Sequence, residues 1–204
     1  DSISIALSVT EVSCNGDCDG TAIAVATGGN APYTYQWNDP SSTVNDTVTG
    51  LCAGTYSLVV TDSLGCTQTA STVISEPSEL ILIDSATNTT CNGECDGEAT
   101  VTITGGLAPY TILWDDPNAQ TNPTATGLCA GTYNVTVTDN NGCQSVAQVT
   151  IEDPDPISLS LQLVEDASCP GACDGSATVV ASGGTLPFTY DWAPSGGTSN
   201  TAIG

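Results

Sequence analysis

A repeat of 77 residues constrains the fold of this chain more than any other feature of its sequence. The heptapeptide CNGDCDG at 14–20 returns as CNGECDG at 91–97, and the related CPGACDG follows at 169–175. The same spacing separates other recurring residues: Trp114, for example, lies 77 residues after Trp37. A fixed period of this length is typical of tandem structural units that share one fold. We therefore divide the 204 residues into repeat 1 (1–77), repeat 2 (78–155) and an incomplete repeat 3 (156–204).

The ten cysteines are consistent with repeats of this small size. A domain of fewer than about 80 residues buries little apolar surface, and disulfides reinforce such domains in oxidising compartments. The sequence therefore predicts an extracellular, disulfide-bonded protein. Zinc binding by the C-x3-C pairs is the less favoured alternative, because the chain has no histidine and the loops are rich in Asp and Gly.

The charge of the chain excludes several classes of partner. It has 23 acidic residues, no Lys, Arg or His, and a formal net charge of −23. Without a basic surface to contact phosphate, we expect no nucleic-acid partner. No apolar run approaches the roughly 18 residues of a membrane helix, so we expect no membrane span. The chain starts at Asp1 with neither Met nor a signal peptide, as a mature protein or a segment of a longer one would.

The composition of each repeat predicts strands rather than helices. Thr, Val, Ser, Ile and Gly dominate, and turn residues recur every 8–12 residues or so, as in all-β sandwiches. We expect an antiparallel sandwich of about seven strands in each complete repeat. The strands expected in repeat 1 are 2–9, 21–27, 55–62 and 67–77, with a tight turn at 62–65. In addition, 28–37 is expected to be a Gly/Pro turn that feeds a strand ending in Trp37.

Alternation along these strands predicts which side chains form the core. The counterparts of Ile23 and Val25 in repeat 2 are threonines, so we expect these two positions to face solvent and the alternate positions of the strand to face the core. Trp37 recurs at the end of its strand, as a core residue would. Tyr56 resembles the tyrosine corner of immunoglobulin-like sandwiches, whose hydroxyl bonds back to the preceding turn. The expected core side chains are Ala22, Ala24, Ala26, Trp37, Tyr56, Leu58 and Val60.

Most residue types that enzymes use for acid–base chemistry are missing. Without His, Lys or Arg, few acid–base or oxyanion arrangements are available, and the cysteines occupy structural positions. Asp115 and Asp116 form a carboxylate pair of the kind that glycosidases use. Repeat 1 has Asn38 and Asp39 at these positions, in a loop. We therefore interpret the pair as solvated turn residues and expect no enzyme activity.

Calcium is the metal that the acidic loops could bind. Asp17 and Asp19 precede Gly20 as the first carboxylates of a calcium loop would, and Asp96 is the counterpart of Asp19. The continuation of an EF-hand is missing, and Ala172 replaces Asp17 in repeat 3. We favour the alternative that these residues complete a turn by accepting backbone N–H groups. We therefore expect no cofactor and little dependence of the fold on calcium.

Each repeat follows one sequence pattern, CNGxCDGxAxVxxxGGxxPYxxxW and then TGLCAGTYxxxVTDxxGC. This pattern resembles the SprB-type repeat found in giant cell-surface adhesins of gliding Bacteroidota. The resemblance covers 1–77, 78–155 and the third repeat as far as the sequence runs. It implies tandem immunoglobulin/PKD-like β-sandwich repeats of about 77 residues. It also implies export by the type IX secretion system and a role in adhesion or surface motility.

Four Asp-Ser/Thr-apolar triplets resemble the O-glycosylation signal of Bacteroidota. They would place sugar on Ser2, Thr47, Ser63 and Ser85. Chance alone gives a few such matches in a chain so rich in Ser and Thr, so these residues are candidates only.

An immunoglobulin-like topology limits which cysteines can meet. It places Cys14, Cys18 and Cys52 at one end of repeat 1 and Cys66 at the other. The strand 55–62 alone spans roughly 25 Å, whereas a disulfide needs Cα atoms within about 7 Å. Cys66 therefore cannot reach a cysteine of its own repeat.

If successive repeats stack end to end, the remaining cysteines can pair between repeats. The predicted bridges are Cys18–Cys52 and Cys95–Cys129 within repeats and Cys14–Cys143 between repeats 1 and 2. Cys66 would then reach back to a preceding repeat and Cys91 forward to repeat 3. The rival pattern is a local Cys14–Cys18 bridge with Cys66 free. Bridges between repeats would turn flexible beads into a stiff rod.

Two functions of different class follow. The first is a structural stalk or adhesive segment of a secreted cell-surface filament, whose partners are neighbouring repeats and other copies of the chain. The second is a repeat module that binds carbohydrate or calcium. The stalk is favoured, because a sugar platform needs exposed aromatic rings and nearly all of them fall at inward or turn positions. The third repeat stops before its last two strands. We expect the segment to be a window on a longer polypeptide, and the less favoured alternative is a neighbouring chain that completes the sheet by strand addition.

Overall fold

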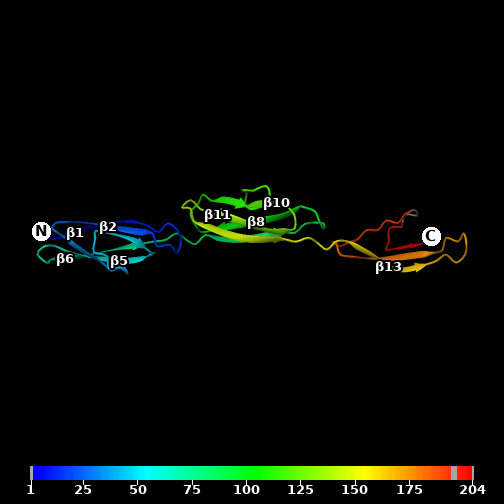
Figure 1. The fold of residues 1–204 in the computed structure, drawn as a ribbon, viewed down its shortest axis with the longest axis horizontal. Helices are drawn as coiled ribbons and strands as arrows, with labels where there is room; N and C mark the ends of the chain where they lie inside the picture. The colour runs from blue at the N-terminus through cyan, green and yellow to red at the C-terminus, as the bar shows by residue number, and fades with distance from the viewer. Residues whose placement is uncertain (1, 194–196, 204) are drawn as a thin grey trace. The chain divides into compact units, whose positions relative to one another are not determined.

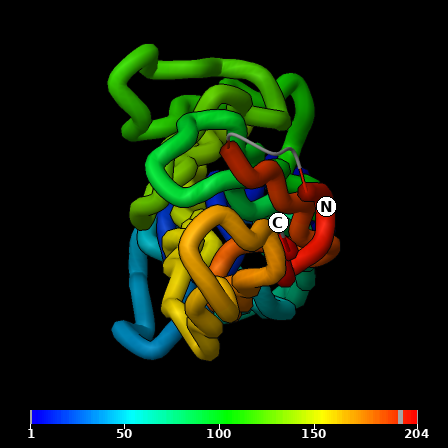
Figure 2. The backbone as a smooth tube through the Cα atoms, turned by 90° about the vertical axis from the view of Figure 1, so that its right-hand side faces the viewer, coloured from blue at the N-terminus to red at the C-terminus, as the bar shows by residue number. Residues whose placement is uncertain are grey.

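The structure is a computed structural model that describes residues 2–193 and 197–203, and every regular element in these ranges is a β-strand (Figure 1). Figure 2 traces the same backbone as a tube coloured by residue number. The all-β fold predicted from the sequence is confirmed. Domain limits at residues 1 and 204 lie outside the described residues. The described elements include no helix that could cross a membrane.

Repeat 1 forms two three-stranded antiparallel sheets. One sheet has the order β1-β2-β4 and the other β3-β5-β6. The strands of the first sheet are β1 (Ser4–Thr10), β2 (Gly20–Thr27) and β4 (Thr47–Leu51). Those of the second sheet are β3 (Thr34–Trp37), β5 (Gly54–Thr61) and β6 (Thr67–Ile74). The pairing register runs from Ser4 opposite Thr27 to Thr10 opposite Thr21 between β1 and β2.

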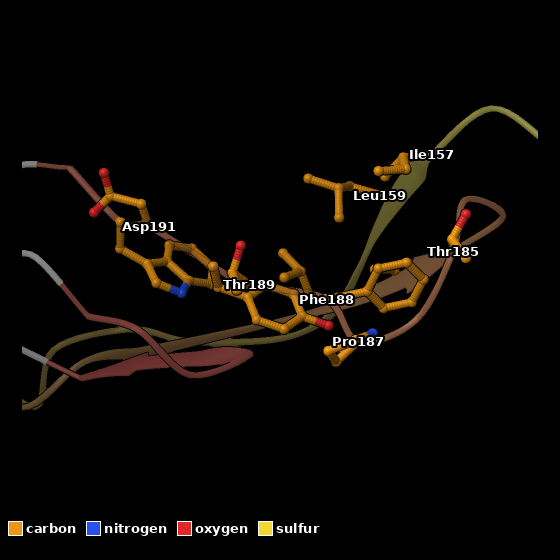
Figure 3. A pocket seen from close by; sticks show the side chains of 11 residues that line it. Ile157, Leu159, Thr185, Pro187, Phe188, Thr189 and Asp191 are labelled. Carbon is orange, nitrogen blue, oxygen red and sulfur yellow. The ribbon is translucent and has the colours of Figure 1, made fainter. Parts of the chain in front are cut away.

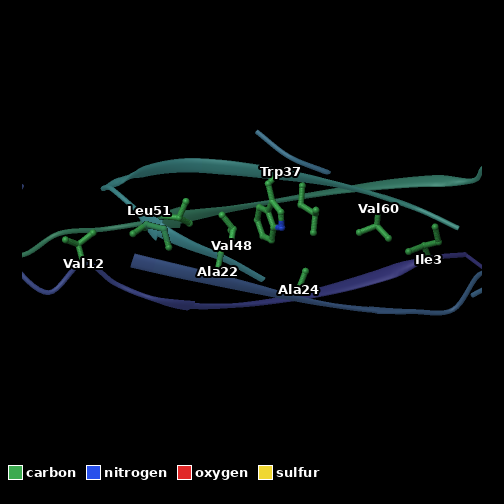
Figure 4. Packing of buried hydrophobic residues seen from close by; sticks show 10 residues of the cluster. Ile3, Val12, Ala22, Ala24, Trp37, Val48, Leu51 and Val60 are labelled. Carbon is green, nitrogen blue, oxygen red and sulfur yellow. The ribbon is translucent and has the colours of Figure 1, made fainter. Parts of the chain in front are cut away.

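The core of repeat 1 lies between these two sheets (Figure 4). Ala22 and Ala24 of β2 face inward, as the alternation predicts, and are 0 % and 3 % exposed. Across from them Trp37 is 1 % exposed, and its indole Nε1 donates to the carbonyl of Asn45 at 3.0 Å. Tyr56 donates its hydroxyl to the carbonyl of Cys52 at 3.0 Å, so the predicted tyrosine corner is confirmed.

The strand β4 was not expected from the sequence. It is only five residues long and follows a turn-rich stretch, so its two inward residues form no readable alternation. Those residues, Val48 and Leu51, are each 2 % exposed and complete the core. With β4 included, each complete repeat has six strands among the described residues, rather than about seven.

Repeat 2 has the same strand orders, with sheets β7-β8-β10 and β9-β11-β12. Its strands are β7 (Ile81–Thr87), β8 (Gly97–Thr104), β9 (Thr111–Trp114), β10 (Thr124–Leu128), β11 (Gly131–Thr138) and β12 (Gln144–Ile151). The counterparts of the repeat 1 core are also buried, including Trp114 at 1 % exposure and Val135 and Val137 at 0 %.

Contacts divide the chain into two compact units that do not follow the repeat boundaries. The first unit contains repeat 1 together with 78–83, 102–113 and 136–147. The second contains 84–101, 114–135 and 148–204.

Repeat 3, in the second unit, has one described sheet of order β13-β14-β15. Its strands are β13 (Ser158–Glu165), β14 (Ser176–Ser182) and β15 (Thr201–Ile203). This sheet corresponds to β1-β2-β4 of repeat 1, because Leu159 pairs with Ala181 as Ile5 pairs with Ala26.

Candidate functional site at the junction between repeats

The CNGDC loop of repeat 1 is tied to the segment that leads into repeat 2. Gly16 has a φ of +82°, which a side chain would disfavour. In this conformation its N–H donates to a carboxylate oxygen of Glu76 at 2.7 Å. The side-chain amide of Asn15 donates to the carbonyl of Pro77 at 3.1 Å. The loop therefore holds the start of the linker in place.

The Asp-Gly pair that ends the motif closes the same loop. Asp19 accepts hydrogen bonds from the hydroxyl and the backbone N–H of Ser13, the latter at 2.9 Å. These bonds, the hydroxyl first, lower the pKa of the Asp19 carboxyl. Gly20 packs so closely that a Cβ there would lie 2.8 Å from both the Leu51 carbonyl oxygen and a methyl of Ile74. These contacts close the motif into a turn.

One disulfide in each complete repeat anchors this loop to the opposite strand end. Cys18 bonds to Cys52 with an S–S distance of 1.95 Å, and Cys95 bonds to Cys129 at 1.92 Å. Cys52 and Cys129 lie immediately after β4 and β10. These are the pairs expected within the repeats.

The other side of the junction is the turn between β11 and β12. Asp139 accepts backbone N–H groups from Leu107, Asn141 and Cys143 at 2.9, 2.9 and 3.0 Å. These bonds, led by that from Leu107, lower the pKa of the Asp139 carboxyl against the opposing effect of burial. Gly142 completes the turn with a φ of +88°. The turn therefore presents Asn141 and Cys143 in a fixed geometry.

Two contacts join this turn to the CNGDC loop, and both lie within the first compact unit. Cys14 bonds to Cys143 with an S–S distance of 2.06 Å and a Cα–Cα distance of 5.6 Å. The side-chain amide of Asn141 donates to the carbonyl of Ser13 at 2.9 Å. The structure thus holds the pair expected between repeats and not the rival Cys14–Cys18 bridge. The cysteines that remain free are Cys66, Cys91, Cys169 and Cys173, and all four are exposed.

The sequence did not reveal the role of Asn141. Its counterpart in repeat 1 is Leu64, so nothing recurs at this position to attract notice. Ser13 was likewise not singled out, because a hydroxyl in a loop is an ordinary surface residue until its partner is known.

Four aspartates in the turns are buried rather than solvated, which corrects the sequence-based interpretation of Asp116. They are Asp39, Asp62, Asp116 and Asp139, at 4–6 % exposure. Burial alone would raise the pKa of the Asp116 carboxyl, but hydrogen bonds from Gln120 and Asn118 outweigh it and lower that pKa. The neighbouring Asp115 is exposed and accepts the backbone N–H of Asn134 at 2.7 Å. The two carboxyl groups therefore have separate turn-forming partners.

The calcium candidates are held by turn contacts of their own. Asp96 accepts the backbone N–H of Thr90 at 2.9 Å, as Asp19 does that of Ser13. Asp17 is exposed, and its backbone N–H donates to the carbonyl of Cys14 at 3.1 Å. Within residues 2–193 and 197–203, no three His, Cys, Asp or Glu side chains are grouped as metal ligands would be.

The glycosylation candidates differ in accessibility. Ser2, Ser63 and Ser85 are exposed, whereas Thr47 is half-buried at the start of β4. The hydroxyl of Ser63 donates to the carbonyl of Asn30 at 3.0 Å, and that of Thr47 donates to the carboxylate of Asp46 at 3.1 Å.

Comparison with protein families finds the SprB repeat model at three places in the chain, residues 6–42, 83–119 and 162–198. These three segments cover more than half of the chain. No curated protein matches the chain significantly.

Solved structures of tandem-domain proteins are similar at low identity. A Dscam structure described as "Structural basis for Dscam isoform specificity" matches 65 % of this chain with 16 % identity and a TM-score of 0.31. This chain spans 40 % of that Dscam chain. Domains 4–9 of the surface layer protein SbsC match 98 % of this chain and 38 % of theirs, with 14 % identity and a TM-score of 0.32. A "tetra-tandem repeat in extending region of large adhesion protein" matches 98 % of this chain and 63 % of its own, with 16 % identity and a TM-score of 0.25.

Proposed function

Because this chain belongs to the SprB repeat family, we propose that it is a structural segment of a large secreted cell-surface protein, in which tandem repeats support adhesion or gliding motility. Type IX secretion is the export route that goes with this proposal. The partners are neighbouring repeats of the same chain and other copies in a filament.

The Cys14–Cys143 bridge is the observation that carries the proposal. It connects a loop of repeat 1 to a turn of repeat 2 across a sequence separation of 129 residues. A binding or catalytic module does not need such a bond, because each repeat already has its own core and its own internal disulfide. A segment that transmits position or force from one repeat to the next does need it.

Two of the free thiols occupy positions equivalent to those of the bridge. Cys66 is the counterpart of Cys143, and Cys91 is the counterpart of Cys14. We propose that Cys66 bonds to a preceding repeat and Cys91 to the counterpart of Cys143 in a complete third repeat, so that one kind of bridge recurs along the protein. Leu64 cannot donate the hydrogen bond that Asn141 makes at the observed junction, so the bridge at Cys66 would lack this second contact.

Immunolabelling of intact cells that produce the protein tests the surface location. An antibody against this segment should label unpermeabilised cells, and deletion of the segment in frame should reduce adhesion or gliding while export continues. Labelling that appears only after permeabilisation would contradict the proposal. Wild-type adhesion after deletion, together with calcium-dependent binding of the isolated segment to a glycan, would instead support the alternative module.

A further inference from the structure

Each cysteine of the bridge between repeats adjoins an Asn-Gly pair. The sequence is CNG at 14–16 and NGC at 141–143, and the chain has one further pair, Asn92-Gly93. Asparagine before glycine is chemically labile, because a glycine without a side chain lets its backbone nitrogen approach the side-chain carbonyl carbon of the asparagine. Two of the three labile pairs in the chain therefore lie at one junction.

Neither of the two turns needs an asparagine in order to form. In repeat 1 Leu64 stands in place of Asn141, and the glycine that follows has a φ of +83°, close to the +88° of repeat 2. In repeat 3 Pro170 stands in place of Asn15, and the next glycine has a φ of +89°, close to the +82° of repeat 1. The two side-chain amides therefore serve the contact between repeats and not the turns.

Both side-chain amides are held while the junction is closed. Asn15 donates to the carbonyl of Pro77 at 3.1 Å, and Asn141 donates to the carbonyl of Ser13 at 2.9 Å. Both asparagines are nevertheless exposed, so water can reach them. The closed junction thus fixes the orientation of two labile amides without shielding them from solvent.

The backbone nitrogens that would attack these amides are held as well. The N–H of Gly16 donates to a carboxylate oxygen of Glu76 at 2.7 Å, and that of Gly142 donates to the carbonyl of Asp139 at 3.1 Å. The attack requires the nitrogen to lose its proton, and a hydrogen bond from the protonated form opposes that loss. Ring closure therefore requires these groups to leave their partners.

We propose that the junction is a deamidation site, at which Asn15 and Asn141 remain amides while it is closed and convert to aspartate or isoaspartate after it opens. In the first step the glycine nitrogen bonds to Cγ of the asparagine, and the amide nitrogen leaves as ammonia with the proton of that N–H. The product is a succinimide. Water then adds to one of its two carbonyl carbons and breaks the C–N bond there. Water is the only co-reactant, and the site is independent of the surface role proposed above.

The products cannot remake the original contacts. A carboxylate at position 141 would face the carbonyl oxygen of Ser13, so two acceptors would meet with no donor between them. At position 15 the new negative charge would lie close to Glu76, in a chain with no Lys, Arg or His to offset it. Deamidation thus converts a transient opening into a lasting change of the junction.

Asn92 provides a matched control within the same chain. Its amide donates to the carbonyl of Pro154 at 3.1 Å, as the equivalent amide of repeat 1 does to its own linker. It lies in the second compact unit, where the carbonyl of Thr90, the counterpart of Ser13, accepts the hydroxyl of Thr185 at 3.5 Å instead of an asparagine amide. Figure 3 shows Thr185 on the turn that follows β14.

Peptide mapping of the intact chain tests the proposal, with a Cys14→Ser and Cys143→Ser variant as the opened junction. Both proteins are incubated in mildly alkaline buffer and digested with Glu-C and chymotrypsin, and the mass of each asparagine peptide is followed over time. We expect deamidation at Asn15 and Asn141 to be at least about five-fold faster in the variant, through local opening. The rate at Asn92 should be the same in both proteins. Equal rates at Asn15 and Asn141 in the two proteins would overturn the proposal, and so would equal acceleration at all three asparagines.

Two substitutions at position 141 test whether the change is lasting. In a glutathione redox buffer, the ratio of bridged to reduced Cys14–Cys143 should be about five-fold lower for Asn141→Asp than for the wild type, because the closed junction loses a hydrogen bond. Asn141→Leu, which introduces the residue of repeat 1 and no charge, should lie between the two. A wild-type ratio in Asn141→Asp would show that deamidation leaves the junction unchanged and would overturn this part of the proposal.

Discussion

Four aspartates are buried in the turns of the two complete repeats, although the chain has no basic side chain to neutralise them. Backbone N–H groups take the place of cations. Asp62, for example, accepts the N–H groups of Asn30, Leu64 and Cys66 at 3.1, 2.9 and 2.9 Å. Among the described residues, every buried side-chain nitrogen or oxygen has a hydrogen-bond partner. Each turn is thus organised by one carboxylate.

Replacement of a turn aspartate should destabilise its repeat. In Asp116→Ala the N–H groups of Asn118 and Gln120 lose the buried acceptor that organises the turn, and each lost hydrogen bond costs about 0.5–1.5 kcal/mol. We expect the melting temperature to fall by roughly 5–10 °C in calorimetry. Asp84→Ala, at an exposed position of β7, should change it by less than about 2 °C. Equal shifts for the two variants would mean that charge, and not the turn, is responsible.

The same carboxylates determine how stability depends on pH. Their pKa values are lowered in the folded chain from an ordinary value of 3.8, for Asp62 because hydrogen bonds from Cys66, Asn30 and Leu64 outweigh the raising effect of burial. The stabilisation is therefore complete above that ordinary value and is lost as the pH falls through the lowered pKa values. With no histidine, the melting temperature should be constant between about pH 6 and 8 and should fall below about pH 4. We propose to measure this in about 0.5 M NaCl, where repulsion among carboxylates is screened. A midpoint of the loss near neutral pH would contradict this account.

Glycine in the Cys-Asp-Gly motif is required by close packing. A methyl group at Gly20 would meet the Leu51 carbonyl and Ile74 at 2.8 Å, so Gly20→Ala should destabilise repeat 1 by about 1–3 kcal/mol in urea unfolding. Gly54→Ala is the matched control, because the nearest atom to its methyl group would lie 3.7 Å away on the ring of Tyr56. We expect that change to be nearly neutral. A neutral Gly20→Ala would show that the backbone there can move aside.

At the scale of the element, the period of two predicted most strands and their inward faces. Expected strands 21–27 and 55–62 correspond to β2 and β5 within one residue. The missed strand β4 has only two inward residues, and its identity depends on pairing with β2, where Val48 lies opposite Ala22. Burial of Asp116 could not be predicted either, because it depends on how the turn folds over the side chain. The cysteine pairs could be predicted, because the topology limits which strand ends can meet. The hydrogen bond of Asn141 could not, because it depends on a single side-chain amide whose position does not recur between repeats.

The intra-repeat disulfide should contribute more to stability than any one strand contact. Cys18–Cys52 closes a loop with a sequence separation of 34 residues, for which chain entropy gives about 3–4 kcal/mol. A double variant Cys18→Ser and Cys52→Ser should lose about that much in the urea unfolding of repeat 1, while repeat 2 unfolds as before. Reduction of the wild type with dithiothreitol is the companion measurement. A loss shared equally by both repeats would show that they do not unfold separately.

At the scale of the whole molecule, the bridge between repeats should restrict the linker rather than stabilise either core. The linker carbonyl of Ser78 accepts the N–H of Gly106 at 2.9 Å, and Asn15 contacts Pro77, so the linker is held on both sides. In a Cys14→Ser and Cys143→Ser variant we expect Glu-C cleavage after Glu79 to accelerate at least about five-fold through local opening.

Cleavage after Glu98, within β8, serves as the internal control for that variant. Its rate should match that of the wild type, because the core of repeat 2 does not depend on the bridge. Acceleration at both sites would mean that loss of the bridge unfolds repeat 2, and no acceleration at either would mean that the linker is held without it.

If the two ends of this segment were pulled apart, the force would be transmitted through the disulfide between Cys14 and Cys143. Tension would enter along β1, cross the two sulfur atoms and leave along β12, so the chain between the two cysteines would carry none of it. The bypassed stretch has a sequence separation of 129 residues, and the Cys18–Cys52 and Cys95–Cys129 bonds inside it hold back 34 residues each. The remaining 129 − 34 − 34 = 61 residues could extend to about 21 nm at roughly 3.5 Å per residue. The segment cannot extend by this length while the Cys14–Cys143 bond is intact, and reduction of that one bond makes the extension possible.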